Sequence, residues 1–364
     1  MHEKRTNIAH LLNQYRSSHQ IPGLAVSIID NGEVVYSQGF GTYDADTPYN
    51  LVTEDTLFSI QGITESFTAS ALVHLEEHST FQLDTPVVEY LPYFQTKRGD
   101  YEKVTTAHLL SHTAGFRENN SVVSLLDENM YNFVKNMPEY KKMIESISDV
   151  DRLRENLTSR EKVTRYFSNL NLKTDPGEQF QYCSDAYMIA ADVLEKVSGM
   201  TWEEYVTSHI FKPLSLTNTT INLPANLDGK TAAKYYMKGI GTPIQTPTPY
   251  NEVGTPVSSI FSTASDLSRY LIAQMTPGEL LSAESLEKMQ SAQVNIGEKS
   301  GYGYGWQVSE HHGLKAMEQS GSCPGISSAL AFIPEKQFGI VFLCNTDMIQ
   351  LEKLGRRIIR RWFS

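Results

Sequence analysis

Glu65 is the residue with catalytic potential in the most distinctive stretch of the chain. A short strand-like run ends at Ile60 and a helical pattern begins at Gly62. A side chain at such a strand-to-helix turn is expected at the mouth of a cleft, facing free helix N–H groups. Gly62 and Glu65 are three residues apart, so both project from the same side of the first turn. Glu65 is therefore either a helix-capping carboxylate or a carboxylate general base.

Cysteine and histidine residues offer further chemistry. Cys183 could act as a nucleophile, although a small buried cysteine is the commoner case, and the same caution applies to Cys323. His108 and His112 have the i, i+4 spacing of metal ligands on a helix, but the glutamate of His-Glu-x-x-His is absent. Residues 311–312, both histidine, predict an exposed turn. No metal ion or other cofactor is expected.

The net charge of −11 and the pI of about 5.4 argue against a nucleic-acid or membrane partner. The basic run 356–363 is the local exception, and its apolar positions predict a terminal helix docked on a sheet rather than on a membrane. Three cysteines are too few for a disulfide framework. The N-terminus has no apolar signal region, which predicts a cytoplasmic protein or one whose leader has been removed.

Strand patterns at both ends of the chain flank a largely helical middle. Strands are predicted at 24–29 and 34–39 around a tight turn, and at 328–333 and 338–343. Residues 118–175 are polar and helix-prone, 213–250 are loop-rich, and 303–308 suggest the start of a strand. We predict a single α+β domain, 1–364, with an α/β lobe (about 1–60 and 255–364) and an inserted helical lobe (about 61–254). A small molecule would bind in the cleft between the lobes of a monomer.

Several motifs resemble, in order, those of class C serine β-lactamases, penicillin-binding proteins and related esterases. Residues 66–69 (Ser-Phe-Thr-Ala) match the segment that follows the family's Ser-x-x-Lys. Further matches are 108–115 (His-Leu-Leu-Ser-His-Thr-Ala-Gly), 176–184 (Pro-Gly-Glu-Gln-Phe-Gln-Tyr-Cys-Ser), 262–267 and 303–306. The resemblance covers nearly the whole chain and implies the family's fold, an antiparallel sheet flanked by helices with an inserted helical lobe.

The resemblance also implies a mechanism from which this chain departs. In the family a serine attacks an acyl carbon, while a lysine and a tyrosine manage its proton. Here Gly62 stands at the serine position and Glu65 at the lysine position, whereas Tyr182 matches the tyrosine. Residues 319–321 (Gln-Ser-Gly) stand where the family has His-x-Gly or Lys-Thr-Gly, so Gln319 replaces the histidine or lysine of that motif. Further pocket positions by this comparison are Ser184, Gly321, Cys323, Val257 and Arg117.

These departures exclude acylation at Gly62, which has no side chain, and leave three hypotheses. The first is non-covalent general-base catalysis by Glu65, such as proton abstraction from carbon, with Tyr182 or Gln319 donating a hydrogen bond to the developing negative charge. The second is an inactive pseudoenzyme that binds a small acyl or peptide-like ligand. The third is residual esterase activity through Cys183 or a bound water.

Overall fold

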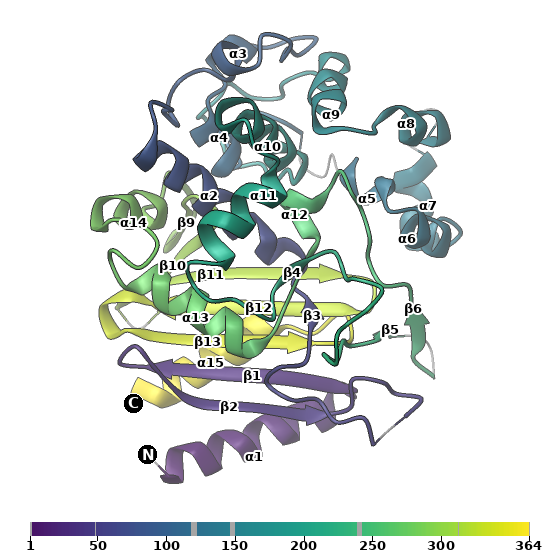
Figure 1. Cartoon of the computed structure of the whole chain (residues 1–364), viewed down its shortest axis with the longest axis vertical. Coiled ribbons are helices and arrows are strands. Elements are labelled where there is room, and N and C mark those ends of the chain that lie inside the picture. Colours follow the sequence, from purple (N-terminus) through teal and green to yellow (C-terminus); the bar gives the residue numbers. More distant parts are fainter. Residues whose placement is uncertain are drawn as a thin grey trace.

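An eight-stranded antiparallel sheet forms the base of the molecule in a computed structural model that describes residues 2–47, 49–117, 122–145, 150–238, 242–311 and 313–363. Both chain ends contribute to this sheet, whose order is β2-β1-β13-β12-β11-β10-β9-β8 (Figure 1). The strands are β1 (Gly23–Asp30), β2 (Glu33–Gly41), β8 (Val294–Gly297), β9 (Ser300–Tyr302), β10 (Gln307–His311), β11 (Leu314–Cys323), β12 (Ile326–Ile333) and β13 (Phe338–Cys344). The predicted α+β class is confirmed.

The two faces of this sheet are covered by different helices. Side chains alternate along a strand, so Leu24 and Val26 of β1 join the core beneath α1 (His2–Ser18) and α15 (Leu351–Phe363). Ala25, on the opposite face, joins the larger core with α2 (Thr64–His78) and α13 (Ala264–Met275). The predicted docking of the C-terminal run on the sheet is confirmed by this packing of α15.

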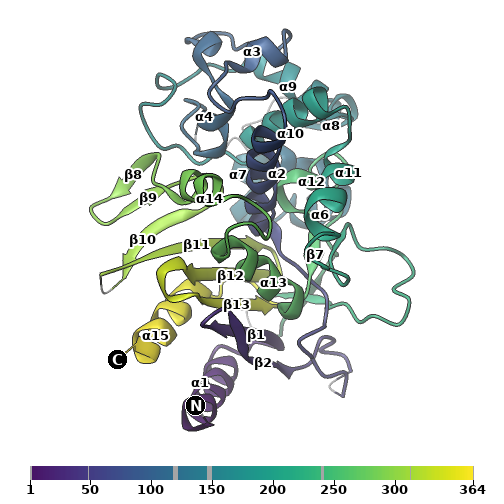
Figure 2. The same ribbon diagram turned by 60° about the vertical axis from the view of Figure 1, so that its left-hand side comes forward.

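A helical region lies on the second face of the sheet, and α2 runs through it in contact with α10, α11, α12 and α14 (Figure 2). Within the described residues, no helix combines the length and apolar character needed to cross a bilayer. The remaining bounds are α3 (Val87–Tyr90), α4 (Thr106–Leu110), α5 (Val123–Leu126), α6 (Glu128–Val134), α7 (Pro138–Glu145), α8 (Val150–Asn156), α9 (Arg160–Tyr166), α10 (Asp185–Ser198), α11 (Trp202–Val206), α12 (Thr255–Ser258) and α14 (Ala283–Gln290). One-turn helices are η1 (Gln61–Ile63), η2 (Tyr101–Lys103), η3 (Phe167–Asn169) and η5 (Pro334–Lys336), and η4 (Thr207–Phe211) is a π-helix.

Residues 213–250 are loop-rich as predicted but include short strands, and the strand start predicted at 303–308 holds only from Gln307 onward. The stretch 213–250 carries three short strands, β4 (Thr220–Ile221), β5 (Tyr235–Met237) and β6 (Ile244–Thr246). β4 pairs with β7 (Ile260–Ser262), which also pairs with β3 (Phe58–Ser59), so tertiary pairing sets these strands rather than local pattern. Residues 303–306 form the turn between β9 and β10, and Gly305 adopts a φ of +73° there.

His311 is also placed differently from the predicted exposed turn; residue 312 lies outside the described residues. His311 ends β10, and its Nε2 lies 3.2 Å from Oε1 of Glu318 on the neighbouring strand β11. Arg356 of α15 donates to both Glu318 oxygens at 3.0 Å. Burial would raise the pKa of Glu318, but hydrogen bonds from His311, Arg356 and Ser309 lower it from 4.5 to about 2. The ion cluster therefore joins the C-terminal helix to the sheet.

Replacing Glu318 with glutamine is expected to destabilise the fold by about 2–3 kcal/mol at pH 7, the worth of a downward shift of this size. A lowered folded-state pKa contributes stability above pH 4.5, and that contribution is lost as the pH falls toward 2. Urea unfolding at pH 7, 5 and 3 should show that the difference in free energy of unfolding between wild type and Glu318→Gln becomes smaller as the pH falls. A difference that stays constant with pH would assign the effect to packing instead.

Candidate active site

The turn from β3 into η1 and α2 is the structural centre of the site. Gln61 precedes Gly62 with a φ of +48°, a conformation that is uncommon and costly for a residue with a side chain. Two contacts hold the turn: Gln61 Nε2 donates to Ser59 Oγ at 2.8 Å, and the Ser328 hydroxyl donates to the Ile60 carbonyl at 2.8 Å. The turn is thus fixed from both its own strand and the main sheet.

Two glycines allow β11 to lie directly against this turn. A Cβ on Gly321 would meet the Ile60 carbonyl oxygen at 2.2 Å, which no side chain can accommodate. A Cβ on Gly62 would meet the Ser320 carbonyl oxygen at 2.9 Å, so a serine there requires the strand to shift slightly. The absence of both side chains sets the close spacing of strand and helix.

Glu65 lies in the first turn of α2 and is fully buried, at 0% exposure. Its Oε1 accepts a 2.9 Å hydrogen bond from the Tyr182 hydroxyl, and its Oε2 lies 3.6 Å from His112 Nε2. A buried carboxylate needs such partners, because leaving a charge unpaired in the interior is very costly. The carboxylate contacts the side chains of Tyr182 and His112 rather than the free backbone N–H groups expected for a helix cap.

His112 presents a defined tautomer to this carboxylate. The backbone N–H of Cys183 donates to His112 Nδ1 at 3.3 Å, so in the neutral ring the proton lies on Nε2, facing Glu65. His112 also adopts a φ of +55°, the second left-handed residue with a side chain beside the site. His108, by contrast, closes a capping box with Thr105 at the start of α4, so the two histidines have separate partners.

Aromatic rings enclose the Glu65–His112 pair. The His112 ring lies 4.5 Å from that of Tyr182 and 4.9 Å from that of Tyr302, measured between centroids. Tyr182 is 36% exposed, so its ring reaches solvent while its hydroxyl contacts the buried carboxylate. Burial, and then the charge of Glu65, raises the pKa of the Tyr182 hydroxyl well above its ordinary value. Tyr182 is therefore a protonated hydroxyl that donates inward.

Gln319 has its amide committed to the protein. Its Nε2 donates to the Tyr302 hydroxyl and to the Gly305 carbonyl, both at 3.2 Å. Its Oε1 accepts from the Ser320 backbone N–H at 3.0 Å. These contacts place the 303–306 turn and Tyr302 against β11, which is a positioning role.

A cavity of about 690 Å³ opens beside these residues. Seven of the nine sequence-predicted site residues lie on its wall: Gly62, Tyr182, Ser184, Val257, Gln319, Gly321 and Cys323. Much of the remaining wall is apolar or aromatic, contributed by Leu125, Met130, Tyr131, Val134, Tyr140, Phe180 and Ile296. Glu65 lies behind Tyr182 and is absent from the wall.

Arg117 is not among the described residues that line the cavity, so its predicted role in substrate binding stays a prediction. The preceding residue, Phe116, packs into the helical region against Phe167 at 4.6 Å between ring centroids. The Gly115 carbonyl accepts from Lys173 N–H at 2.7 Å, which ties this loop to 171–174. Arg117 itself is exposed.

Cys183 is also unsuited to the nucleophilic role considered from the sequence. It is 1% exposed and is not on the cavity wall. Burial, and then the charge of Asp185, raises the pKa of its thiol well above the ordinary value. Since the thiolate is the reactive form, this cysteine is a poor nucleophile.

The charge on the described cavity wall is one-sided. Among the described residues that line the cavity, Asp127 has the one ionisable carboxylate and there is no Lys, Arg or His. Asp127 caps α6, accepting from Met130 N–H at 2.9 Å and from Tyr250 N–H at 2.7 Å. Burial raises the pKa of Asp127, although these backbone donors oppose it.

Sequence reasoning missed His112, Tyr302 and Asp127 as members of the site. His112 lies in a recognised motif, 108–115, but its left-handed backbone and its link to Cys183 depend on tertiary contacts. Tyr302 directly precedes the 303–306 motif, and Asp127 lies at the start of the helix-prone middle segment. His112 could have been found from its place within motif 108–115, and Tyr302 from its place next to motif 303–306.

Comparison with known proteins places this fold. The family model described as Beta-lactamase matches residues 8–360. Protein flp of Staphylococcus aureus is 24% identical over 337 residues, covering 92% of this chain and 61% of that protein. A penicillin-binding protein of Bacillus subtilis is 25% identical over 358 residues, covering 94% and 72% of the two chains.

Solved structures agree on the architecture. The octameric penicillin-binding protein homologue from Pyrococcus abyssi has a TM-score of 0.83 at 24% identity, covering 98% of this chain and 77% of that one. A D-stereospecific amidohydrolase from Streptomyces has a TM-score of 0.69 at 22% identity, with 90% of each chain covered. With a family model that spans nearly the full length, the chain belongs to the Beta-lactamase family, on the fold of the penicillin-binding proteins.

Proposed function

We propose that this β-lactamase-like hydrolase scaffold binds a small molecule in the cavity and removes a proton from it through Tyr182 and Glu65, without an acyl-enzyme. The observation that carries the proposal is the 2.9 Å hydrogen bond from the Tyr182 hydroxyl to Glu65 at the cavity wall. Glu65 is fully buried behind that ring, so a ligand meets Tyr182 first.

The proton would move in a relay. The substrate C–H bond breaks, its proton passes to the Tyr182 oxygen, and the hydroxyl proton of Tyr182 passes to Glu65. The substrate keeps the electron pair, and the carboxylate ends neutral. Because the raised pKa of Tyr182 disfavours a free tyrosinate, the two transfers would occur together. The Ser184 hydroxyl, on the same wall, can donate to the negative charge that develops on the substrate.

The cavity wall favours a neutral or cationic ligand. Asp127 carries the wall's ionisable carboxylate, and no cationic side chain among the described wall residues is available to pair with a ligand carboxylate. An anionic ligand would lose its hydration without compensation. The apolar and aromatic part of the wall suits a ligand with a flat or acyl hydrophobic portion.

A second candidate is a binding protein without catalysis. The favouring observation is that Glu65 is fully buried and already accepts the Tyr182 hydroxyl, so its carboxylate does not face the cavity. In that case the same cavity would hold a neutral acyl or peptide-like ligand. Esterase activity through Cys183 has no support from the geometry, because that thiol is buried away from the cavity wall.

The discriminating experiment is a pH–rate profile with 5-nitrobenzisoxazole, a chromogenic carbon acid. Removal of its C3 proton breaks the ring N–O bond and releases a coloured phenolate, so no other reactant is needed. We expect a saturable rate above that of buffer that rises with pH, because a general base acts in its deprotonated form. Saturable binding of the probe with no rate above that of buffer would overturn the catalytic proposal in favour of the binding protein.

A further inference from the structure

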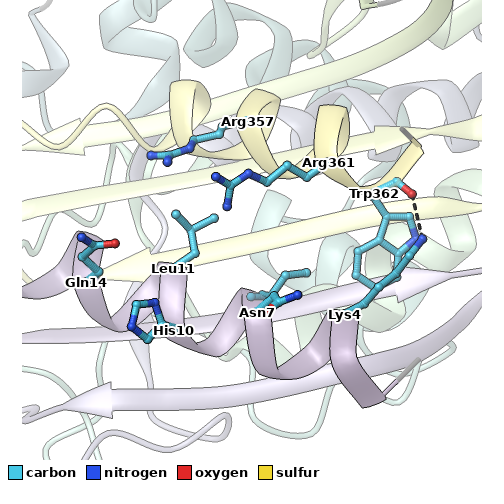
Figure 3. Close-up of a pocket in the computed structure, with 9 residues that line it drawn as sticks. Lys4, Asn7, His10, Leu11, Gln14, Arg357, Arg361 and Trp362 are labelled. Carbon is cyan, nitrogen blue, oxygen red and sulfur yellow. Dashed lines mark hydrogen bonds between the residues drawn. The ribbon is translucent and has the colours of Figure 1, made fainter.

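A second cavity lies on the opposite side of the main sheet, between the first and last helices. Its volume is about 440 Å³, and it is lined by side chains of α1 and α15. In Figure 3, Arg357 and Arg361 extend from α15 toward the part of α1 that carries Leu11 and Gln14, whereas Lys4 lies at the other end of the cavity beside Trp362. Ile8, Leu11 and Trp362 are each less than 10% exposed and form its floor.

This cavity concentrates positive charge in a protein of net charge −11. Among the described residues that line it, three are permanently cationic (Lys4, Arg357 and Arg361) and none is acidic. Lys4 Nζ donates to the Trp362 carbonyl at 3.0 Å, which leaves its charge uncompensated. Arg356, only one residue earlier, is paired with Glu318, whereas no ion pair within the described part of the chain involves Arg357 or Arg361.

We propose that this cavity, the α1–α15 groove, binds a small anion carrying at least two negative charges, such as a diphosphate or phosphomonoester. Arg357 and Arg361 are four residues apart and so share one face of α15. Two guanidinium groups on one face, with the Lys4 ammonium beside Trp362 at the end of the groove, suit the several oxygens of such an anion. The amides of Asn7 and Gln14 add uncharged donors on the α1 side.

The structure favours a small molecule over a membrane surface as the source of this anion. A helix that binds a membrane interface inserts an apolar face, but the apolar residues of α15 (Leu354, Ile358 and Ile359) are already buried against the sheet. The cavity volume also lies within the range of small-molecule sites. The groove is independent of Tyr182 and Glu65, so its test does not depend on the proposed catalysis.

Calorimetric titration with inorganic pyrophosphate tests the proposal in full-length protein. We expect one site per chain, an affinity that falls with added NaCl, and a loss of about tenfold or more in Arg357→Gln/Arg361→Gln. Arg360→Gln is the matched control, because Arg360 is an exposed arginine of the same helix that does not line the groove. Arg357→Lys/Arg361→Lys should recover part of the binding, which separates charge from misfolding.

Three outcomes would overturn the proposal. Wild type that binds no pyrophosphate at 50 mM salt excludes the site. Equal weakening by Arg360→Gln would show diffuse surface attraction rather than a groove. Binding to phosphatidylserine vesicles that depends on Arg357 and Arg361, without binding of pyrophosphate, would assign the groove to a membrane instead.

Discussion

Glu65→Gln is expected to lower turnover of 5-nitrobenzisoxazole by about two to four orders of magnitude, the usual contribution of a positioned base. Glutamine keeps the shape of the side chain, and its amide oxygen can still accept the Tyr182 hydrogen bond. It cannot accept the relayed proton, however. Affinity for the probe and the unfolding midpoint should therefore change little while kcat falls. Stopped-flow absorbance and probe titration measure the two quantities separately.

Two further variants make this result specific. Tyr182→Phe removes the hydroxyl that links the cavity to Glu65, so the relay predicts a loss of kcat of similar order. Glu77→Gln is a matched control on the same helix, where the carboxylate accepts from the Ser282 backbone away from the cavity. Full turnover in a folded Glu65→Gln protein would leave Glu65 only as the buried acceptor for Tyr182 and His112.

The double substitution Gly62→Ser/Glu65→Lys is expected to create acyl-transfer activity that wild type lacks. Wild type has no atom at position 62 to acylate, so penicillins and fluorophosphonates should leave no adduct there. Gly62→Ser alone should do little, because a lone hydroxyl is a weak nucleophile and Glu65 would oppose the developing oxyanion. The added lysine supplies the proton acceptor beside Tyr182. A burst of nitrophenol from a short-chain ester, with a matching adduct by intact-mass spectrometry, is the expected result.

This gain should come with a measurable cost in stability. The new Cβ would lie 2.9 Å from the Ser320 carbonyl oxygen, so β11 must shift. Such overpacking costs about 1–3 kcal/mol, which urea unfolding of Gly62→Ser can detect. Adding Gln319→His should raise the burst modestly. A folded double variant that shows neither burst nor adduct would mean that the site differs from a serine hydrolase at more positions than these.

The sequence was sufficient for the fold, and seven of the nine residues that it assigned to the site line the cavity. Motifs such as 66–69 and 303–306 are short, continuous stretches of sequence, so they can be recognised without a structure. Gly321 illustrates this: the motif placed it at the site, and the 2.2 Å approach of Ile60 explains why it has no side chain. Positions that follow from backbone geometry were therefore predicted well.

Properties that depend on burial could not be obtained in this way. Whether Glu65 faces a ligand or the protein depends on the Tyr182 ring, which comes from 117 residues further along the chain. Arg117 follows a motif directly, yet Phe116 directs this loop into the core. The position of His311 depends on Glu318, which lies on the paired strand β11, and on Arg356, which is 38 residues beyond Glu318. Each of these cases depends on long-range side-chain contacts.

The order of strands in the main sheet has a consequence for synthesis of the protein. β1 is made first, but its neighbour β13 (Phe338–Cys344) is made more than 300 residues later. Until then the β1–β2 hairpin leaves the ribosome with an unpaired apolar edge, which is prone to aggregation. β11, which forms part of the cavity wall, also arrives late. The proposed ligand site is therefore incomplete until nearly all of the chain has been made, and small C-terminal truncations should lower the yield of protein more than their size suggests.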